Sequence, residues 1–452
     1  MGKLFGSSGV RGVVNTEITP DLVCQVGSAV ATHVKAKLAI VACDTRISAN
    51  MFEDAIVCGL ISTGSDVLLA HVVPTPVLAY ATKVYGADVG FMLTASHNPP
   101  QYNGIKVFKS DLAYTDTEQA AIEKIITNNT YQQTNWQNLG NITAIDAQTI
   151  YLKEILNNVA LTLPWHVVVD SGCGAAYDVA PKMFKKLGCK VTALNSQPDG
   201  YFPARKSEPT KEALQDLTKT VEAIGADIGV AFDGDADRVV FVDEKGEFID
   251  FDRALAAYAA HALKHTNGKT IVTTIEASMA IETMAQKYGG KVLRTRVGDI
   301  YVSEAIKQCG AVFGGEPCGA WIHPKHHLCA DGLLSAAMFL VAMEAQNKSV
   351  SECIAKIPKY PTERINFACK NTQKHNLINQ LAEVLKAEFP DYTDFSTIEG
   401  TRLTLKNGWL LVRASGTEPL IRLTVEGQSE SITKDITSKA TALINKQKEA
   451  LT

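Results

Sequence analysis

Three aspartates alternate within one short loop between two apolar runs. Asp233, Asp235 and Asp237 lie in the stretch DIGVAFDGDADRVVFVDEKG (227–246). Carboxylates this close repel one another unless a cation binds between them, and their hard oxygen ligands suit Mg²⁺. The alternative is a solvated acidic turn, which the apolar flanks disfavour. A loop this short can fill only part of the octahedral coordination shell of Mg²⁺. The other positions are open to water or a phosphate oxygen.

The spacing of this loop also fits a calcium-binding EF-hand, with Glu244 as the last ligand. The sixth position, however, is Arg238 where an EF-hand needs glycine, and the strand-like run VVFVD follows where a helix would be required. The EF-hand is therefore rejected, and a magnesium site is predicted.

A serine follows a second apolar run, in TASHNPPQYNGIKVF (94–108). Ser96 lies beside His97, and Pro99 and Pro100 restrict the backbone that follows. The GxSxG elbow of α/β-hydrolases is absent. A lone Ser-His pair is also compatible with a structural loop. Near a magnesium site, however, phosphoryl transfer through Ser96 becomes plausible because the cation neutralises a phosphoserine. Lys106 is placed to supply charge or a proton.

Two further loops have residues suited to a sugar phosphate. In RASGTEPLIR, the side chains and backbone of Arg413, Ser415, Gly416, Thr417 and Arg422 suit a phosphate dianion. The alternative is a glycine-centred turn with surface arginines. In GGEPCGAW (314–321), a glutamate between glycines suits sugar hydroxyls or an amino group. That glutamate is Glu316.

Three other motifs are rejected. HPKHHLC (323–329) is too cramped for a zinc site and has no second ligand pair. DSGCGAAYD (170–178) has tyrosine in place of the last glycine of a dinucleotide fingerprint, so we interpret it as a tight strand-to-helix turn. GKT at 268–270 lacks the first glycine of a P-loop.

Composition excludes several classes of protein. The net charge is -4 without blocks of like charge, so nucleic-acid binding is not expected. The ten cysteines contain no CxxC pair, which indicates reduced thiols. The N-terminal residues have no apolar signal-peptide region, and the apolar run at 333–343 is too short to span a bilayer. We expect a soluble cytoplasmic protein without a membrane partner.

The elements that must position these loops are short apolar strands alternating with helical stretches. This pattern predicts an α/β fold with parallel sheets covered on both faces. A chain of 452 residues is expected to form two to four domains. Three changes in composition suggest four: the polar stretch 127–143, the change at 250–252, and KIPKYPTER at 356–364. The predicted strands are 38–43, 66–73, 88–93, 166–170, 190–194, 227–232, 239–243, 270–275, 291–297 and 311–315.

A weak internal repeat supports this division. Similar Gly-Ala-apolar runs begin at Gly86, Gly225 and Gly310, and they lead to Ser96, Asp233 and Glu316 in turn. Each is a short strand followed by a polar loop. The repeat suggests three similar α/β domains, each offering the carboxyl end of a strand to a shared cleft, where ligands of such sheets usually bind.

Taken together and in this order, the loops resemble those of the α-D-phosphohexomutase superfamily. The matching motifs are FGSSGVRG, TASHNPPQYNGIK, PDGYFP, DGDADR, RVGD, GEPCG and RASGTEPLIR. The resemblance implies four domains around a central cleft, the last a smaller α+β domain. The expected units are 1–147 with the phosphoserine, 148–250 with the metal, 251–358 with the sugar contact and 359–452 with the phosphate loop.

The resemblance also implies a mechanism. Ser96 would be the phosphoserine, which binds Mg²⁺ together with the three aspartates. Arg11, His97 and Lys106 would line the reaction centre, with Lys106 as a general acid or base. Phospho-Ser96 would pass its phosphoryl group to a hexose phosphate, and the bisphosphate would turn over in the cleft and return its other phosphate. A hexose 1,6-bisphosphate would act as activator.

The roles of the remaining loops follow from the same resemblance. Glu316 and Cys318 would contact the sugar, and the arginine loop with Arg413, Ser415, Gly416, Thr417 and Arg422 would hold the phosphate that is not reacting. RVGD and the form FGSSGVRG are most like archaeal-type phosphoglucosamine mutases, which favours glucosamine phosphate as substrate. Cys318 and Ala320 depart from the family's usual serine and histidine.

Alternative functions remain open. A phosphomannomutase/phosphoglucomutase would use the same loops on another sugar. A Mg²⁺-dependent phosphatase would lose the phosphoryl group to water, although a separate phosphate loop favours retention of a bisphosphate. A catalytically silent sugar-phosphate sensor is disfavoured because Ser96, the three aspartates and Lys106 are all present. The sequence is compatible with either a monomer or a homo-oligomer.

Overall fold

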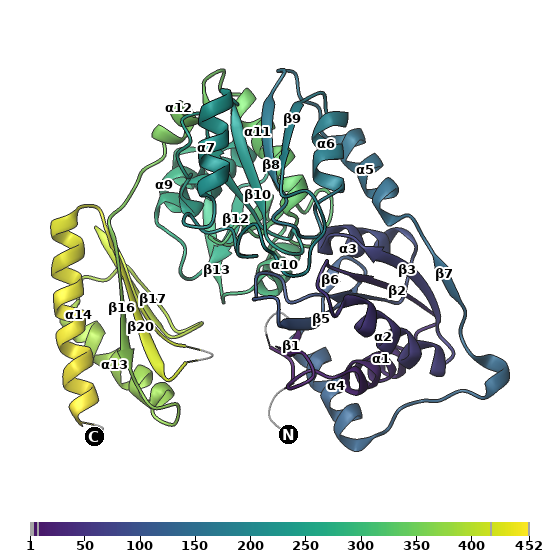
Figure 1. Ribbon diagram of the computed structural model, residues 1–452. Helices are drawn as coiled ribbons and strands as arrows, with labels where there is room; N and C mark the ends of the chain where they lie inside the picture. The colour runs from purple at the N-terminus through teal and green to yellow at the C-terminus, as the bar shows by residue number, and fades with distance from the viewer. Residues whose placement is uncertain (1–3, 7–8, 416–417, 451–452) are drawn as a thin grey trace.

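The computed structural model of the protein describes residues 4–6, 9–415 and 418–450. Within these residues, four sheets follow one another along the chain, and helices pack against them (Figure 1). The C-terminal sheet, drawn in yellow and green, lies to one side of the other three. None of the described helices is long and apolar enough to cross a membrane. The predicted four-domain α/β architecture is confirmed.

The first sheet has the strand order β1-β5-β4-β2-β3-β7, with β6 paired to β5. Strand β2 is parallel to β3 and β4, whereas β5 is antiparallel to β4. The elements of this part are β1 (Val10–Val13), α1 (Pro20–Val34), β2 (Leu38–Cys43), α2 (Ala49–Ser62), β3 (Asp66–Val72), α3 (Thr75–Val84), β4 (Val89–Leu93), β5 (Tyr102–Lys109), β6 (Leu112–Ala113), α4 (Asp116–Asn128), the 3₁₀ helix η1 (Trp136–Asn138) and β7 (Ile142–Ala144).

The segment 127–143, predicted to be a linker, differs from that expectation. It begins in the last turn of α4, and its end forms β7, which pairs in parallel with β3. Strand β7 is only three residues long and all of its side chains are exposed, so its sequence is too short to predict a strand. Pairing through backbone groups alone therefore joins this segment to the first sheet.

The second and third sheets have the orders β11-β10-β8-β9 and β13-β12-β14-β15. The second is accompanied by α5 (Ala147–Asn158), β8 (His166–Asp170), α6 (Val179–Lys186), β9 (Lys190–Leu194), α7 (Gln215–Ile224), β10 (Ile228–Phe232) and β11 (Val239–Asp243). The third follows with α8 (Phe251–His265), β12 (Thr270–Thr274), α9 (Ala280–Lys287), β13 (Lys291–Thr295), α10 (Asp299–Cys309), β14 (Phe313–Gly315), β15 (Trp321–Ile322), α11 (Gly332–Glu344) and α12 (Val350–Ala355).

The internal repeat corresponds to one shared strand order. The series β5-β4-β2-β3, β11-β10-β8-β9 and β15-β14-β12-β13 match strand for strand. In each, the first two strands are antiparallel and the other pairs are parallel. The three loops marked by the repeat connect β4 to β5, β10 to β11 and β14 to β15. The same local topology therefore presents each polar loop.

The fourth sheet is antiparallel throughout, in the order β16-β20-β19-β18-β17. Its elements are β16 (Thr362–Ala368), α13 (Lys374–Glu388), β17 (Asp394–Ser396), β18 (Thr401–Leu405), β19 (Gly408–Ala414), β20 (Leu420–Gly427) and α14 (Glu430–Ala450). It has a separate core, and a small cluster of Ile275, Trp409 and Leu411 joins it to the third part of the chain.

Helix ends are encoded locally. Thr19 caps α1 by accepting a hydrogen bond from the Leu22 amide, and proline follows at the first helical position. Thr115 and Glu118 form a capping box at the start of α4. Helices α7 and α10 end at Gly225 and Gly310 in the left-handed conformation.

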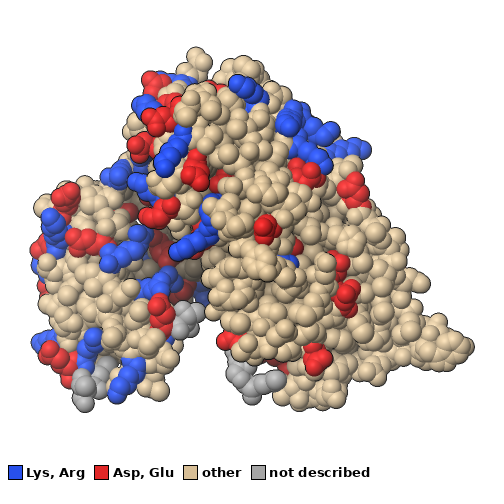
Figure 2. All heavy atoms as spheres, in the orientation of Figure 1, with Lys and Arg blue, Asp and Glu red and all other residues tan. Residues whose placement is uncertain are grey.

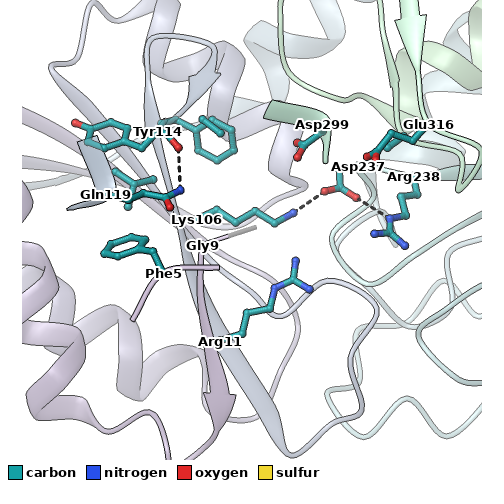
Figure 3. A pocket seen from close by; sticks show the side chains of 14 residues that line it. Phe5, Gly9, Arg11, Lys106, Tyr114, Gln119, Asp237, Arg238, Asp299 and Glu316 are labelled. Atoms are coloured by element: carbon teal, nitrogen blue, oxygen red, sulfur yellow. Dashed lines mark hydrogen bonds and ion pairs between the residues drawn. The ribbon is translucent and has the colours of Figure 1, made fainter. Parts of the chain in front are cut away.

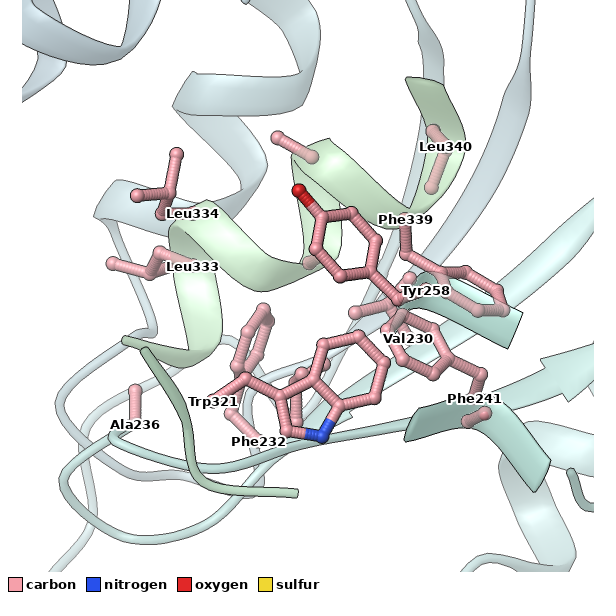
Figure 4. Packing of buried hydrophobic residues seen from close by; sticks show 14 of the residues in the cluster. Val230, Phe232, Ala236, Phe241, Tyr258, Trp321, Leu333, Leu334, Phe339 and Leu340 are labelled. Atoms are coloured by element: carbon pink, nitrogen blue, oxygen red, sulfur yellow. The ribbon is translucent and has the colours of Figure 1, made fainter. Parts of the chain in front are cut away.

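Aromatic side chains join the second and third parts in one core (Figure 4). Phe241 of β11 stacks on Phe339 of α11 with ring centroids 4.0 Å apart, and Trp321 of β15 packs against both. Tyr258 of α8 stacks on Trp321. Offset and edge contacts of this kind add to the stabilisation from burial. The loops after β10 and β14 are thus supported by a shared rigid core.

Candidate active site

The serine loop connects β4 to β5 at the carboxyl end of β4. Ser96 is fully buried and has a φ of 51°, a left-handed conformation that is uncommon outside glycine. Its amide donates to Thr94 Oγ1 over 2.8 Å. Its carbonyl oxygen accepts from Arg46 Nη2 and from Ser207 Oγ, both at 2.9 Å. The backbone of Ser96 is therefore held on both sides, which fixes the direction of its hydroxyl.

The serine hydroxyl lies against the acidic loop. Ser96 Oγ donates to Asp233 Oδ2 over 2.7 Å, although the two residues are 137 positions apart. Asp233, Asp235 and Asp237 are buried, and one ligand atom from each lies within 4.8 Å of the others. Among the described residues, this is the one group of His, Cys, Asp and Glu side chains close enough to hold a metal ion. The predicted residues are thus brought together.

The donor set of this cluster fits Mg²⁺. Asp235 Oδ1 and Asp237 Oδ1 are buried and have no hydrogen-bond partner in the described part of the chain. Buried carboxylate oxygens without partners are costly, and a hard divalent cation satisfies them. Asp235 Oδ2 accepts from Thr75 Oγ1, which orients that carboxylate.

Lys106 reaches the same cluster from β5. Its Nζ donates to Asp235 Oδ2 over 2.7 Å and also to Asp237 Oδ2. Burial by itself would lower the pKa of Lys106, but the attraction of Asp235 and Asp237 outweighs it and holds the pKa above its ordinary value. The side chain is therefore an ammonium that neutralises part of the acidic charge.

The pKa values of Asp233 and Asp235 are shifted in opposite directions. Burial raises the pKa of Asp233 well above its ordinary value, and the neighbouring charges of Asp237 and Asp235 raise it further. Burial would also raise the pKa of Asp235, but the charge of Lys106 and its hydrogen bond lower it below the ordinary value. The opposite shifts arise because Lys106 bonds directly to Asp235, whereas the weaker effects of Arg238 and Lys106 on Asp233 do not offset its burial.

Arg11 and His97 flank the serine. Arg11 lies on β1 and donates from Nη1 to Asn98 Oδ1 over 3.0 Å. His97 Nδ1 is 3.2 Å from Ser96 Oγ. Burial lowers the pKa of His97 to about 3, and the charges of Arg238 and Arg11 contribute. The imidazole is therefore neutral near pH 7 and can accept or donate one hydrogen bond without carrying charge.

A pocket lies between the first sheet and the third (Figure 3). Arg11 and Lys106 line it from one side, and Asp237, Asp299 and Glu316 line it from the other. The picture shows Lys106 pointing across the pocket toward Asp237. Arg238 also lines the pocket beside Asp237, so cationic groups face the pocket from both sides and carboxyl groups from one, which suits a ligand with both phosphate and hydroxyl or amino groups.

Glu316 follows β14 as predicted. Its Oε2 accepts from the Gly298 amide over 2.7 Å, in the RVGD motif. Burial, followed by the charge of Asp299, raises the pKa of Glu316 to about 8. Ala320 lines the pocket, whereas Cys318 is not among the lining residues. Burial raises the pKa of the Cys318 thiol to about 12, so it is neutral.

The arginine loop of the fourth sheet lies outside this pocket. Arg413 of β19 is the cross-strand neighbour of Arg422 of β20. Arg413 pairs through Nη2 with Glu276 Oε2 at 2.7 Å and through Nη1 with Glu399 Oε1 at 3.3 Å. Arg422 Nη2 pairs with Glu418 Oε2 at 2.7 Å. Both arginines are thus occupied by carboxylates.

Of the remaining residues of that loop, Ser415 is hydrogen-bonded within the fourth part of the chain. Ser415 Oγ accepts from the Glu418 amide over 3.1 Å, and the Ser415 carbonyl accepts from Lys374 Nζ over 2.6 Å. Gly416 and Thr417 lie outside the described residues. The space-filling view shows basic and acidic side chains on both sides of the hollow beside the C-terminal part (Figure 2).

Several residues at the site were not singled out from the sequence. Arg46 binds the serine loop, Thr75 orients Asp235, and Asp299 lines the pocket. Arg46 has a local signal, since CDTR follows the apolar strand LAIVAC. Asp299 lies within the RVGD motif. Thr75 has no comparable signal, because its partner is 160 residues away.

Four family models match successive parts of the chain. They describe domains of phosphoglucomutase/phosphomannomutase: the alpha/beta/alpha domain I at residues 2–133, domain II at 149–246, domain III at 250–360 and the C-terminal domain at 365–442. The matches cover most of the chain, in the order that the motifs indicate.

Curated relatives match nearly end to end. A protein of Methanothermobacter thermautotrophicus named "Probable phosphoglucosamine mutase" is 42% identical, with 95% of this chain and 94% of that protein covered. Proteins of the same name from Pyrococcus horikoshii and Methanococcoides burtonii are 40% and 44% identical, with 98% and 94% of this chain and 98% and 95% of theirs covered.

Solved structures agree with the fold. A phosphoglucomutase/phosphomannomutase family protein from Burkholderia thailandensis superposes with a TM-score of 0.89 at 28% identity, covering 99% of this chain and 98% of that one. A structure described as a putative phosphomannomutase from Thermus thermophilus has a TM-score of 0.81 at 24% identity, with 98% of each chain covered, and is evidence of the fold alone.

Proposed function

Because the chain belongs to the phosphoglucomutase/phosphomannomutase family and is a phosphate-transferring mutase, we propose that it interconverts glucosamine 6-phosphate and glucosamine 1-phosphate. The reaction proceeds through phosphorylated Ser96 and a bisphosphorylated sugar. The proposal assigns the phosphoserine to residues 1–147, the metal to 148–250, the sugar contact to 251–358 and the phosphate clamp to 359–452.

One observation carries the proposal: the hydroxyl of Ser96 donates to Asp233 within a group of three buried carboxylates. A serine in this position can exchange a phosphoryl group beside a divalent cation. Among the described residues, no carboxylate is hydrogen-bonded to His97, the neutral imidazole near Ser96 Oγ, as one would be to the base of a hydrolase triad. Phosphoryl transfer therefore accounts for the geometry better than acyl transfer.

Asp233, Asp235, Asp237 and phosphorylated Ser96 would hold Mg²⁺. When bound, the cation neutralises charge on the transferring phosphoryl group. Lys106 remains an ammonium through its contacts with Asp235 and Asp237, so it acts as a proton donor or a fixed positive charge.

The transfer breaks the bond from Ser96 Oγ to phosphorus and forms one from a sugar oxygen to phosphorus, while the sugar hydroxyl loses its proton and Ser96 Oγ gains one. The reverse step uses the other phosphate of the turned sugar, so Ser96 is phosphorylated again and no phosphate is consumed. Arg11 and His97 lie beside the phosphoryl group throughout. A hexose 1,6-bisphosphate activates the enzyme because it phosphorylates Ser96.

The other groups hold the sugar at both ends. Glu316 accepts a hydrogen bond from the sugar, and Cys318 of the same loop also contacts the sugar. Arg413, Ser415, Gly416, Thr417 and Arg422 bind the phosphate that is not reacting. This separation of the reacting and the held phosphate lets the sugar bind in two orientations, with positioning and charge supplying most of the rate enhancement.

The choice of glucosamine follows two lines of support. The archaeal relatives at 40–44% identity are named probable phosphoglucosamine mutases. The carboxyl groups of Asp299 and Glu316 also line the pocket, and their oxygens can accept hydrogen bonds from a sugar amino group. Mannose and glucose phosphates are the alternative substrates, which the name of the family itself suggests.

The test compares substrates with the full-length protein. With Mg²⁺, glucosamine 6-phosphate and a trace of glucose 1,6-bisphosphate, glucosamine 1-phosphate should form without release of inorganic phosphate. The kcat/KM for glucosamine phosphate should exceed those for mannose and glucose phosphates. Free phosphate as the main product would instead indicate a phosphatase. Ser96→Ala should lose nearly all turnover while its thermal unfolding stays normal, and an active variant would refute the phosphoserine.

A further inference from the structure

Two buried arginine-aspartate pairs occupy equivalent places in the first two sheets. Strands β2 and β8 each lie next to the strand that leads into a functional loop. Asp44 directly follows β2 and pairs with Arg46 at 3.0 Å, and Asp170 ends β8 and pairs with Arg205 at 2.8 Å. All four side chains are at most 3% exposed. The repeat therefore extends from strand order to individual ion pairs.

Arg46 binds the serine loop along its whole length. Its Nη1 donates to the carbonyls of Pro99 and Tyr102 at 2.7 and 2.8 Å. Its Nη2 donates to the carbonyls of Ser96 and Asn98 at 2.9 and 2.7 Å. With the bond from Nε to the aspartate, all five donors of the guanidinium are used. The Arg46 side chain thus links Ser96 to the proline-containing segment that follows it and to the first residue of β5.

Arg205 has the corresponding role at the acidic loop. Its Nη2 donates over 2.7 Å to the carbonyl of Phe232, the residue before Asp233, and its Nη1 donates to the Lys206 carbonyl at 3.0 Å. Gly172 allows this approach, because a Cβ there would lie 2.5 Å from Arg205 Nη2. The DSGCG turn, which has no nucleotide role, therefore makes room for the arginine.

Stability alone is a poor explanation for these pairs. Burying two charges costs desolvation free energy, and such pairs are often no more stabilising than apolar residues of the same size. They do fix geometry, because a planar guanidinium with four or five hydrogen bonds to the protein restricts the arrangement of its acceptors. Neither arginine lines the pocket, so neither is placed to contact substrate.

We propose that Arg46 and Arg205 are positioning residues with separate tasks, which rests on the proposed function of Ser96. Arg46 holds Ser96 in its left-handed conformation so that Oγ faces the phosphoryl group. Arg205 holds the end of β10 so that Asp233 and its neighbours converge on the cation. Loss of the first arginine impairs phosphoryl transfer, and loss of the second impairs metal binding.

The experiment uses the full-length protein with Arg46→Lys and Arg205→Lys. A lysine supplies at most three donors, so several buried carbonyls lose their partners. Three quantities are measured: kcat and KM with glucosamine 6-phosphate, the rate at which glucose 1,6-bisphosphate phosphorylates Ser96 by mass spectrometry, and the Kd of Mn²⁺ by electron paramagnetic resonance. Arg402→Lys, a buried arginine of β18, is the control for a general effect on stability.

For Arg46→Lys we expect kcat and the rate of Ser96 phosphorylation to fall about 10²-fold, as for misplacement by about 1 Å, with KM unchanged and the Mn²⁺ Kd of the unphosphorylated protein unchanged. For Arg205→Lys we expect the Mn²⁺ Kd to weaken about tenfold or more, with kcat partly restored at saturating metal. The Arg402 variant should change none of these.

A milder variant guards against misfolding. Ser207→Ala removes the other donor to the Ser96 carbonyl and should lower kcat about fivefold, which corresponds to one hydrogen bond. Unchanged kcat in both Arg46→Lys and Ser207→Ala, with Ser96→Ala inactive, overturns the positioning role alone. Equal loss of Mn²⁺ affinity in both arginine variants overturns the division of tasks. An active Ser96→Ala overturns the proposed function itself.

Discussion

Glu276 forms an ion pair with Arg413, the arginine that we propose binds the phosphate of the substrate. Arg413 Nη2 lies 2.7 Å from Glu276 Oε2, so a phosphate bound by this guanidinium must displace the carboxylate. We therefore predict that Glu276→Gln tightens substrate binding. The neutral amide keeps the size of the side chain but loses the charge that competes with phosphate.

The magnitude follows from the exposure of the pair. The two side chains are 21% and 30% exposed, and Glu399 holds Arg413 at 3.3 Å on the other side. A partly exposed pair of this kind contributes up to about 1 kcal/mol. Removing that competition corresponds to a decrease of about fivefold in KM for glucosamine 6-phosphate at low ionic strength. The effect should diminish as salt screens the charges, and kcat should be unchanged.

Glu282→Gln provides a matched control for this prediction. Glu282 lies in α9 and pairs with Arg294 at 2.6 Å, with exposures of 31% and 11% and no contact with Arg413. Its removal should leave KM unchanged. Steady-state kinetics of the three proteins across a salt series is the assay. A KM for Glu276→Gln equal to or higher than that of the unmodified protein would refute the reasoning.

Three further predictions concern the loops, the pH dependence and the metal. Gly234→Ala should lower kcat at least tenfold because its Cβ would lie 2.5 Å from the Ser96 carbonyl oxygen, where a displacement misplaces the nucleophile. Gly225→Ala, strained at a φ of 60° but with open space around it, should lower only the melting temperature. Burial lowers the pKa of His323 from 6.5 to about 3, so below pH 6.5 the unfolded chain takes up a proton that the folded protein does not. The free energy of unfolding should then fall by about 2 kcal/mol between pH 6.5 and 5 from this side chain, and His323→Gln should show a smaller difference in melting temperature between pH 7 and 5. EDTA should abolish activity, and Mg²⁺ at about one hundred times its Kd should stabilise the fold by about 2.7 kcal/mol, an increase absent in Asp233→Asn.

The sequence by itself determines the local chemistry. Asp233, Asp235 and Asp237 lie in one loop, so their alternation between apolar runs is enough to predict a cation site. The strands that precede Ser96 and Glu316 are equally evident, because burial on both faces of a parallel sheet requires continuous apolar runs. The order of the motifs along the chain is sufficient to identify the family. These features depend on neighbours within a few residues.

Only the tertiary structure decides which of these loops meet. The bond from Ser96 to Asp233 spans 137 positions, and no periodicity encodes it. The short, exposed strand β7 is equally hard to predict from the sequence, because it joins the first sheet through backbone pairing. Arg46 lies just after β2 and Arg413 near the end of β19, yet Arg46 binds backbone carbonyls of the serine loop together with Asp44, whereas Arg413 pairs with two carboxylates. Their different roles arise because packing of separate sheets selects the partners of each charged group.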